Sequence, residues 1–278
     1  MYVESGIPPI LTIFVPPSRL NGYRIGGGLH AVTAVGHTFS TSFRRNSPIP
    51  ATPKLFTSTE FVPSIVLHDD QVGMYLDAEV RALTSDEERT IDKLGLPART
   101  AIEIHYKSDS LVCYCTGLIV PFPNRVMLEG VEATLRAASL IDKDMQAGGF
   151  VDRGRDKVLR TFLVRSNTYK ESLLYNSHMS RALRSVYRGL PMPRSIWVVE
   201  FGYLDEWEGQ VAPENLLVHG EFIFDSTSAD VYRACLAVHM PSSVTAYDVT
   251  LPTRHPKRYH ISNDTQGYPT YVCHSGRP

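Results

Sequence analysis

The sequence contains little of what usually identifies an enzyme or a secreted protein. Its 278 residues include four cysteines, at positions 113, 115, 235 and 273, too few for a disulfide-stabilised scaffold and wrongly spaced for a zinc knuckle. No GxGxxG, GxxxxGK(S/T) or GxSxG motif occurs, so a dinucleotide-binding fold, a P-loop and a hydrolase nucleophile elbow have no support. We therefore expect buried, reduced thiols and no cofactor.

Long apolar runs are missing as well. The longest apolar stretch near the start, Ile10–Val15, is interrupted by Thr12 and lies between two proline pairs. It is too short for the apolar region of a signal peptide or for a transmembrane helix. We expect no signal peptide and no transmembrane segment, and hence a cytoplasmic or otherwise intracellular protein.

The residues that are present predict a folded, β-rich body. With 43% hydrophobic and 21% charged residues, the chain can bury a sizeable core. In residues 1–124, short β-branched and aromatic runs recur between turn residues, which is typical of a sandwich or barrel. One short helix is predicted at Ser85-Asp86-Glu87-Glu88, a capping box that Gly95 can close. The predicted strands are Ile10–Val15, Leu29–Phe43, Phe56–Leu67, Val72–Leu83, Ala101–Tyr106 and Leu111–Val120.

Helical spacing replaces this pattern in residues 125–190. An amphipathic helix is predicted over Arg125–Gln146, and a second helical tract over Arg155–Arg188 with a break near Ser166. In residues 191–278 strands return, at Ser195–Leu204, Leu216–Asp225 and Val244–Thr250. The order predicts an α+β fold, a sandwich- or barrel-like body with a central two-helix segment. The three regions could together form one compact domain.

Charge is distributed very unevenly along the chain. The net charge is −1, yet residues 151–194 contain ten lysines and arginines against three aspartates and glutamates. Internal pairing or solvation of arginine heads could account for this excess, and so could an anionic partner. RNA and an anionic membrane surface both fit the second explanation. The residues predicted to bind such a partner are Arg153, Arg155, Lys157, Arg160, Lys170, Arg181, Arg184 and Arg188.

The last part of the basic segment has a separate polar face if it is helical. On a helical wheel, apolar side chains of Lys170–Leu190 gather on one side, and Lys170, Arg181, Arg184 and Arg188 gather on another. A second basic cluster, Arg254–His260, could extend the same surface or be a solvated loop.

Two further sites are weaker candidates. His219 and Glu221 alternate with apolar residues and could present two metal ligands, with a third from His68, Asp69 or Asp70, although the polar face of a half-exposed strand is the simpler interpretation. His30 or His178 could act as an acid–base residue beside the arginines.

These observations favour a non-enzymatic structural or assembly protein that binds an anionic partner through its basic tract and self-associates in a matrix- or coat-like layer. The first alternative is an RNA-binding or RNA-processing protein that uses histidine and arginine chemistry. The second is a metal-dependent enzyme centred on His219 and Glu221.

Overall fold

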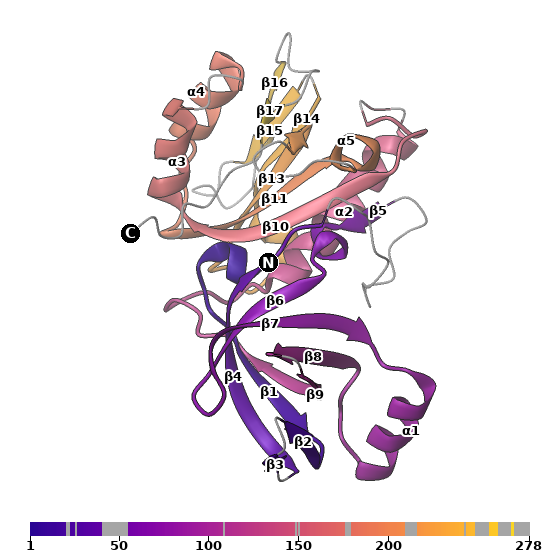
Figure 1. Ribbon diagram of the computed structural model, residues 1–278. Helices are drawn as coiled ribbons and strands as arrows, with labels where there is room; N and C mark the ends of the chain where they lie inside the picture. Colours follow the sequence, from indigo (N-terminus) through magenta and orange to yellow (C-terminus); the bar gives the residue numbers. More distant parts are fainter. Residues whose placement is uncertain are drawn as a thin grey trace. The chain divides into compact units, whose positions relative to one another are not determined.

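The chain folds into two compact units, which are described separately (Figure 1). The barrel unit contains Tyr2–Asn46 and Glu60–Phe122, and the sheet unit contains Met1, Ser47–Thr59 and Pro123–Pro278. The α+β, β-rich fold class predicted from the sequence is confirmed. The computed structural model describes residues 1–20, 23–25, 27–40, 55–107, 109–147, 149, 151–175, 179–208, 216–241, 243–247, 256–260 and 268–269.

Six antiparallel strands close the barrel unit, in the order β1-β4-β6-β7-β8-β9. Inward positions of these strands are apolar, as on β1, where Leu11, Ile13 and Val15 are buried while their neighbours are partly exposed. Alternation of this kind is expected for strands with one face on a core. The barrel strands are β1 (Ile10–Val15), β4 (Gly28–His37), β6 (Ser64–Asp69), β7 (Gly73–Ala82), β8 (Thr100–Tyr106) and β9 (Asp109–Ile119).

A short helix, α1 (Ser85–Leu94), connects β7 to β8. Its capping box uses Thr84 with Glu87, one residue before the predicted start, and Gly95 ends it with a positive φ of 63° as the sequence predicts. The smaller elements of this part of the chain are η1 (Val3–Ser5), η2 (Ser58–Phe61), and the ribbon of β2 (Ser18–Leu20) and β3 (Tyr23–Ile25).

A seven-stranded sheet in the order β16-β15-β14-β13-β11-β10-β5 organises the sheet unit. All its neighbouring strands are antiparallel except β5 and β10. Every residue of β11 is buried, which means that both faces of the sheet are covered there. The strands are β5 (Leu55–Thr57), β10 (Lys157–Arg165), β11 (Ser195–Tyr203), β13 (Gly220–Asp225), β14 (Cys235–Met240), β15 (Ser243–Tyr247) and β16 (Pro256–His260); β12 (Leu217–Val218) pairs with β17 (Tyr268–Pro269).

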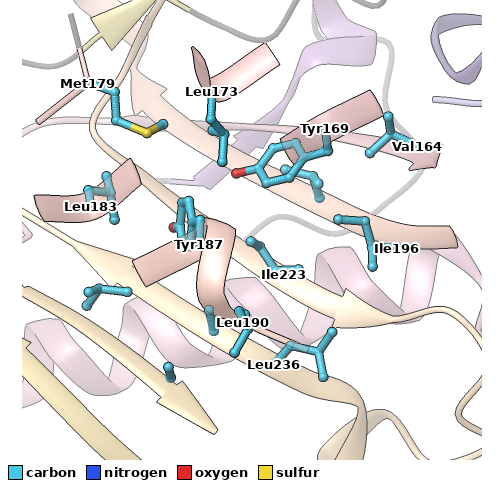
Figure 2. Close-up of a cluster of buried hydrophobic side chains, with 14 of the residues drawn as sticks. Val164, Tyr169, Leu173, Met179, Leu183, Tyr187, Leu190, Ile196, Ile223 and Leu236 are labelled. Atoms are coloured by element: carbon cyan, nitrogen blue, oxygen red, sulfur yellow. The ribbon is translucent and has the colours of Figure 1, made fainter. Parts of the chain in front are cut away.

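Helices cover the two faces of this sheet. On one face, α2 (Gly130–Gln146) packs on β10 and β11, and its Thr134 hydroxyl bonds the Thr161 hydroxyl at 2.7 Å. On the other face, α3 (Ser166–Tyr175) and α4 (Arg181–Gly189) bury Tyr169, Leu183 and Tyr187 against the sheet (Figure 2). The short helices α5 (Leu204–Trp207) and α6 (Val231–Ala234) follow β11 and precede β14. No helix in the described ranges is long and apolar enough to cross a membrane.

The structure corrects the predicted second helical tract. Residues Lys157–Arg165, expected to be helical, form β10, and helix begins at Ser166, where the sequence suggested a break. Phe162 and Val164 of this strand face α3 and α4, and Thr161 faces α2. A strand that is covered on both faces reads as a continuous apolar run, which periodicity alone does not distinguish from a buried helix.

Candidate anion-binding surface

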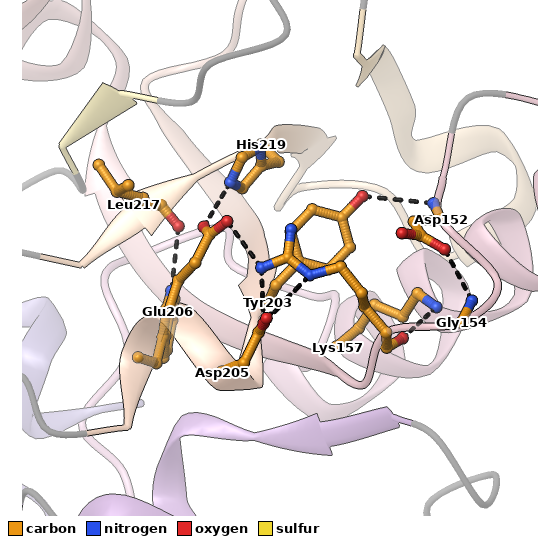
Figure 3. Close-up of polar contacts among 10 residues, drawn as sticks. Asp152, Gly154, Lys157, Tyr203, Asp205, Glu206, Leu217 and His219 are labelled. Carbon is orange, nitrogen blue, oxygen red and sulfur yellow. Dashed lines mark hydrogen bonds and ion pairs between the residues drawn. The ribbon is translucent and has the colours of Figure 1, made fainter.

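Arg155, the second arginine of the basic segment, is held in the sheet unit by two acidic partners. Arg155 bonds Asp205 through Nε and Nη2, at 3.1 and 2.6 Å, and bonds Glu206 through Nη2 at 2.7 Å (Figure 3). Its guanidinium also lies over the Tyr203 ring, 3.9 Å from the centroid. The hydrogen bonds from Arg155 lower the pKa of Asp205. Arg155 is therefore part of an internal ion-pair network.

Lys157 and Arg160 are buried on β10. The Lys157 ammonium donates to the Arg155 carbonyl (Figure 3), and the Arg160 guanidinium pairs with Glu200 of β11 at 3.2 Å. The side chains of Arg160 and Glu200 are 6% and 0% exposed. Neither cation faces solvent, so the prediction that both bind an external partner has no structural support.

Two further cations of the segment bond backbone carbonyls. Arg153 is exposed, and its Nη2 donates to the Gln146 carbonyl at 3.2 Å. Lys170 of α3 donates to the Leu190 carbonyl at 2.6 Å, and partial burial lowers the pKa of its ammonium. Lys170 thus ties α3 to the end of α4.

The remaining three arginines lie on one face of α4. Arg181, Arg184 and Arg188 are spaced i, i+3 and i+7, while Leu183 and Tyr187 on the opposite side are buried. No acidic residue occurs in the helix, and none of the three arginines has an ion pair within the described part of the chain. The Nε of Arg184 is buried without a hydrogen-bond partner among the described residues.

The position of Arg181 is unfavourable for the helix itself. Arg181 is the first residue after the N-cap Ser180, where the helix dipole disfavours a cation. By contrast, the first turn of α1 carries three acidic residues, Asp86, Glu87 and Glu88. Helix stability therefore explains the charges of α1 and does not explain Arg181.

A hollow lies next to α4, and none of the three arginines is among the residues that line it. Its volume is about 380 Å³, and its lining comes from the C-terminal half of α4 and from β15 and β16. Lys257 of β16 stands on its rim, with its ammonium 5.3 Å from the centroid of the Tyr259 ring. The second basic cluster noted in the sequence thus contributes one lysine to the lining of this hollow. The lining residues are Ser185, Val186, Gly189, Leu190, Pro191, Ala246, Tyr247, Lys257 and Tyr259.

The two predicted metal ligands, His219 just before β13 and Glu221 on it, are not brought together. His219 donates from Nε2 to Glu206 at 2.6 Å, and its ring lies 4.7 Å from that of Tyr203 (Figure 3). Glu221 accepts a 2.8 Å bond from the Tyr169 hydroxyl on the α3 side of the sheet. They do not form a converging ligand group among the described residues, and His68, Asp69 and Asp70 belong to the barrel unit.

The candidate acid–base histidines are not part of this surface. His30 lies in the barrel unit, with Nε2 3.1 Å from Asp69 Oδ2. His178 lies outside the described residues. The lining of the hollow includes no histidine and no acidic residue among the residues described.

Comparison with known proteins gives this chain no relative. Neither the protein-family models, nor the curated proteins, nor the solved structures contain a match to it.

The sequence did not reveal which arginines have internal partners. Asp205 and Glu206 lie about fifty residues after Arg155, and only the pairing of β10 with β11 brings them close. The signal that the sequence did contain was the helical spacing of Arg181, Arg184 and Arg188. Residues with this spacing share one face of a helix whatever the tertiary fold is.

Proposed function

We propose that this protein is a non-enzymatic RNA-binding assembly protein that holds the phosphates of a single strand on α4. Arg181, Arg184, Arg188 and Lys257 supply the positive charge. The observation that carries this proposal is the row of three α4 arginines without acidic partners among the described residues. A hollow with a lysine on its rim lies next to the same helix.

The dimensions of the surface suit a nucleic acid strand. Arg181 and Arg188 are seven residues apart, which is about 10 Å along a helix and enough to contact more than one phosphate of a strand. Tyr247 and Tyr259 line the hollow beside them. Aromatic rings next to cations are the usual composition of a surface that stacks bases and tracks a backbone.

The exposed residues of α4 favour RNA over a membrane. They are Arg181, Ala182, Ser185, Arg188 and Gly189, and none is a large apolar side chain. A helix that lies in a membrane interface needs large apolar groups beside its cations to enter the acyl boundary. The absence of such groups on this helix argues against the membrane alternative.

Fluorescence anisotropy with a labelled single-stranded RNA tests the proposal. The wild type is compared with R181Q/R184Q/R188Q and with R89Q/K93Q/R233Q, which removes the same charge from exposed positions of α1 and α6. We expect the α4 variant to lose binding by at least about tenfold and the matched variant to bind nearly as well as the wild type. Equal weakening in both would leave only a net-charge effect and overturn the proposal.

Vesicles containing anionic or neutral lipids are the second arm of the experiment. Binding to anionic vesicles that depends on the α4 arginines, with no RNA binding, would replace RNA by a membrane surface as the partner. Sedimentation of the free and RNA-bound protein measures whether copies self-associate, as an assembly role requires.

A further inference from the structure

A second candidate site lies in the barrel unit and is independent of α4. His30 comes from β4, Asp69 ends β6, and Asp70 begins the turn to β7. His30 Nε2 is 3.1 Å from Asp69 Oδ2 and 3.8 Å from Asp70 Oδ1. One ligand atom from each of the three residues lies within 4.8 Å of the others.

The barrel fixes the positions of these side chains. His30 is two residues from Val32, whose side chain is in the barrel core, so the same strand face carries both. Asp69 has a side chain that is 3% exposed, and its Oδ1 accepts the backbone N–H groups of Gln71 and Val72 at 2.8 and 3.1 Å. That anchoring turns its other oxygen, Oδ2, toward His30.

Buried nitrogen atoms of two histidines give an independent indication of a ligand. The Nε2 atoms of His30 and His68 are both buried without a hydrogen-bond partner among the described residues. The 3.1 Å approach of Asp69 to His30 lacks hydrogen-bond geometry. Buried polar atoms are normally satisfied, by protein, water or an ion. Both histidines line one cavity of about 410 Å³, together with Asp69 and Asp70.

We propose that His30, Asp69 and Asp70 bind a divalent transition-metal ion of the zinc type. Ligand atoms about 2.1 Å from a tetrahedral ion are about 3.4 Å from one another, and the observed 3.1 and 3.8 Å lie on either side of that value. Imidazole together with carboxylates favours Zn²⁺ and its neighbours over Mg²⁺ or Ca²⁺.

Titration of the full-length, chelator-treated protein with Co²⁺ and with Zn²⁺ tests the site. Co²⁺ is the probe because it gives a visible absorption band when it is bound in a low-symmetry site of this kind. We expect one tightly bound ion, displaced by Zn²⁺, and affinity at least about tenfold lower in H30A and in D70N, since even an outer-shell change at a metal site costs about 10–100-fold.

D70N and one further variant, H105A, keep the result interpretable. Asp70 is 82% exposed, so D70N removes a ligand without disturbing the core. H105A removes an exposed histidine of β8 in the same unit and should bind Co²⁺ as the wild type does. Absence of a Co²⁺ band in the wild type, or equal affinity in wild type, H30A and D70N, would overturn the proposal. RNA binding through α4 is measured separately and does not depend on this outcome.

Discussion

Both ends of the basic segment are rich in arginine, but the surroundings of these arginines are opposite. At the first end, Arg155 and Arg160 bond Asp205, Glu206 and Glu200 inside the sheet unit. At the second end, Arg181 and Arg188 stand exposed on α4, without ion pairs among the residues that the structure describes.

Secondary structure accounts for this difference. A strand covered on both faces leaves no solvent side for a cation, so Lys157 and Arg160 need partners within the fold. A helix packed by one face keeps its other face in water, and α4 exposes Arg181 and Arg188 there. An excess of arginine in a sequence therefore indicates a binding surface only where the local structure leaves the guanidinium groups exposed.

The largest expected effect concerns the buried pair. Arg160→Met leaves the fully buried Glu200 carboxylate without the guanidinium beside it, and we expect the free energy of unfolding of the sheet unit to fall by about 3–5 kcal/mol. Urea denaturation followed by tryptophan fluorescence measures this, because Trp197 and Trp207 are both buried in that unit. The double variant R160M/E200M should recover much of the loss, and a single-variant cost below about 1 kcal/mol would contradict the interpretation.

Ion pairs of arginine should also make the stability of the fold depend on pH in the acid range. In the barrel unit, the hydrogen bonds from Arg81 lower the pKa of Glu87 from 4.5 to about 2. Because the folded pKa is the lower one, this contribution to stability is complete above pH 4.5 and disappears as the pH falls toward 2. We expect a loss of about 2–3 kcal/mol over that interval.

Far-UV circular dichroism during denaturant titrations at several pH values measures this loss. Glu87→Gln keeps an acceptor for the N-cap of α1 but cannot titrate, so its unfolding should depend less on pH between 5 and 2. R181Q/R184Q/R188Q should leave the wild-type pH profile unchanged. An unaltered profile in E87Q would show that the Arg81–Glu87 pair is not responsible.

The salt dependence of RNA binding distinguishes the exposed arginines from the paired ones. Four contacts to single-stranded phosphates predict a slope of about −3 for the logarithm of the binding constant against the logarithm of the salt concentration. Lys257→Gln should reduce the steepness by about 0.7, and the triple α4 variant by about 2. Slopes that match the wild type in both variants would place the RNA elsewhere.

The smallest expected effect is a gain in stability. Arg181→Glu puts an acidic residue in the first turn of α4, where the helix dipole favours it, and should stabilise the sheet unit by about 0.3–1 kcal/mol. The same change should weaken RNA binding, since it reverses a charge in the proposed surface. Denaturation midpoints and anisotropy on one protein preparation check both; destabilisation by R181E would mean that Arg181 serves the fold.

Much of the barrel could be predicted from the sequence, because alternating apolar residues and turn signals are local. Ile10–Val15 is a strand with the predicted bounds, and the predicted run Phe56–Leu67 divides into β5, η2 and β6. β14, at Cys235–Met240, was missed because its residues are buried on both faces and show no alternation. The β10 error has the same cause.

The candidate surface was predicted only in part, for a related reason. The stripe of Arg181, Arg184 and Arg188 is a local pattern on one helix, whereas the pairing of Arg155 with Asp205 depends on strand order. The cluster of His30 with Asp69 and Asp70 depends on strand order too, since β4 and β6 are neighbours only in the closed barrel.

The last strand of the described sheet, β16, would connect the proposed RNA binding to the proposed assembly. It begins with Pro256 and carries the exposed cations Lys257 and Arg258. Proline and like charges on an outer strand oppose edge-to-edge pairing between copies. A bound polyanion would neutralise that repulsion. β16, which opposes edge-to-edge pairing in the free protein, would then allow copies to associate once RNA is bound.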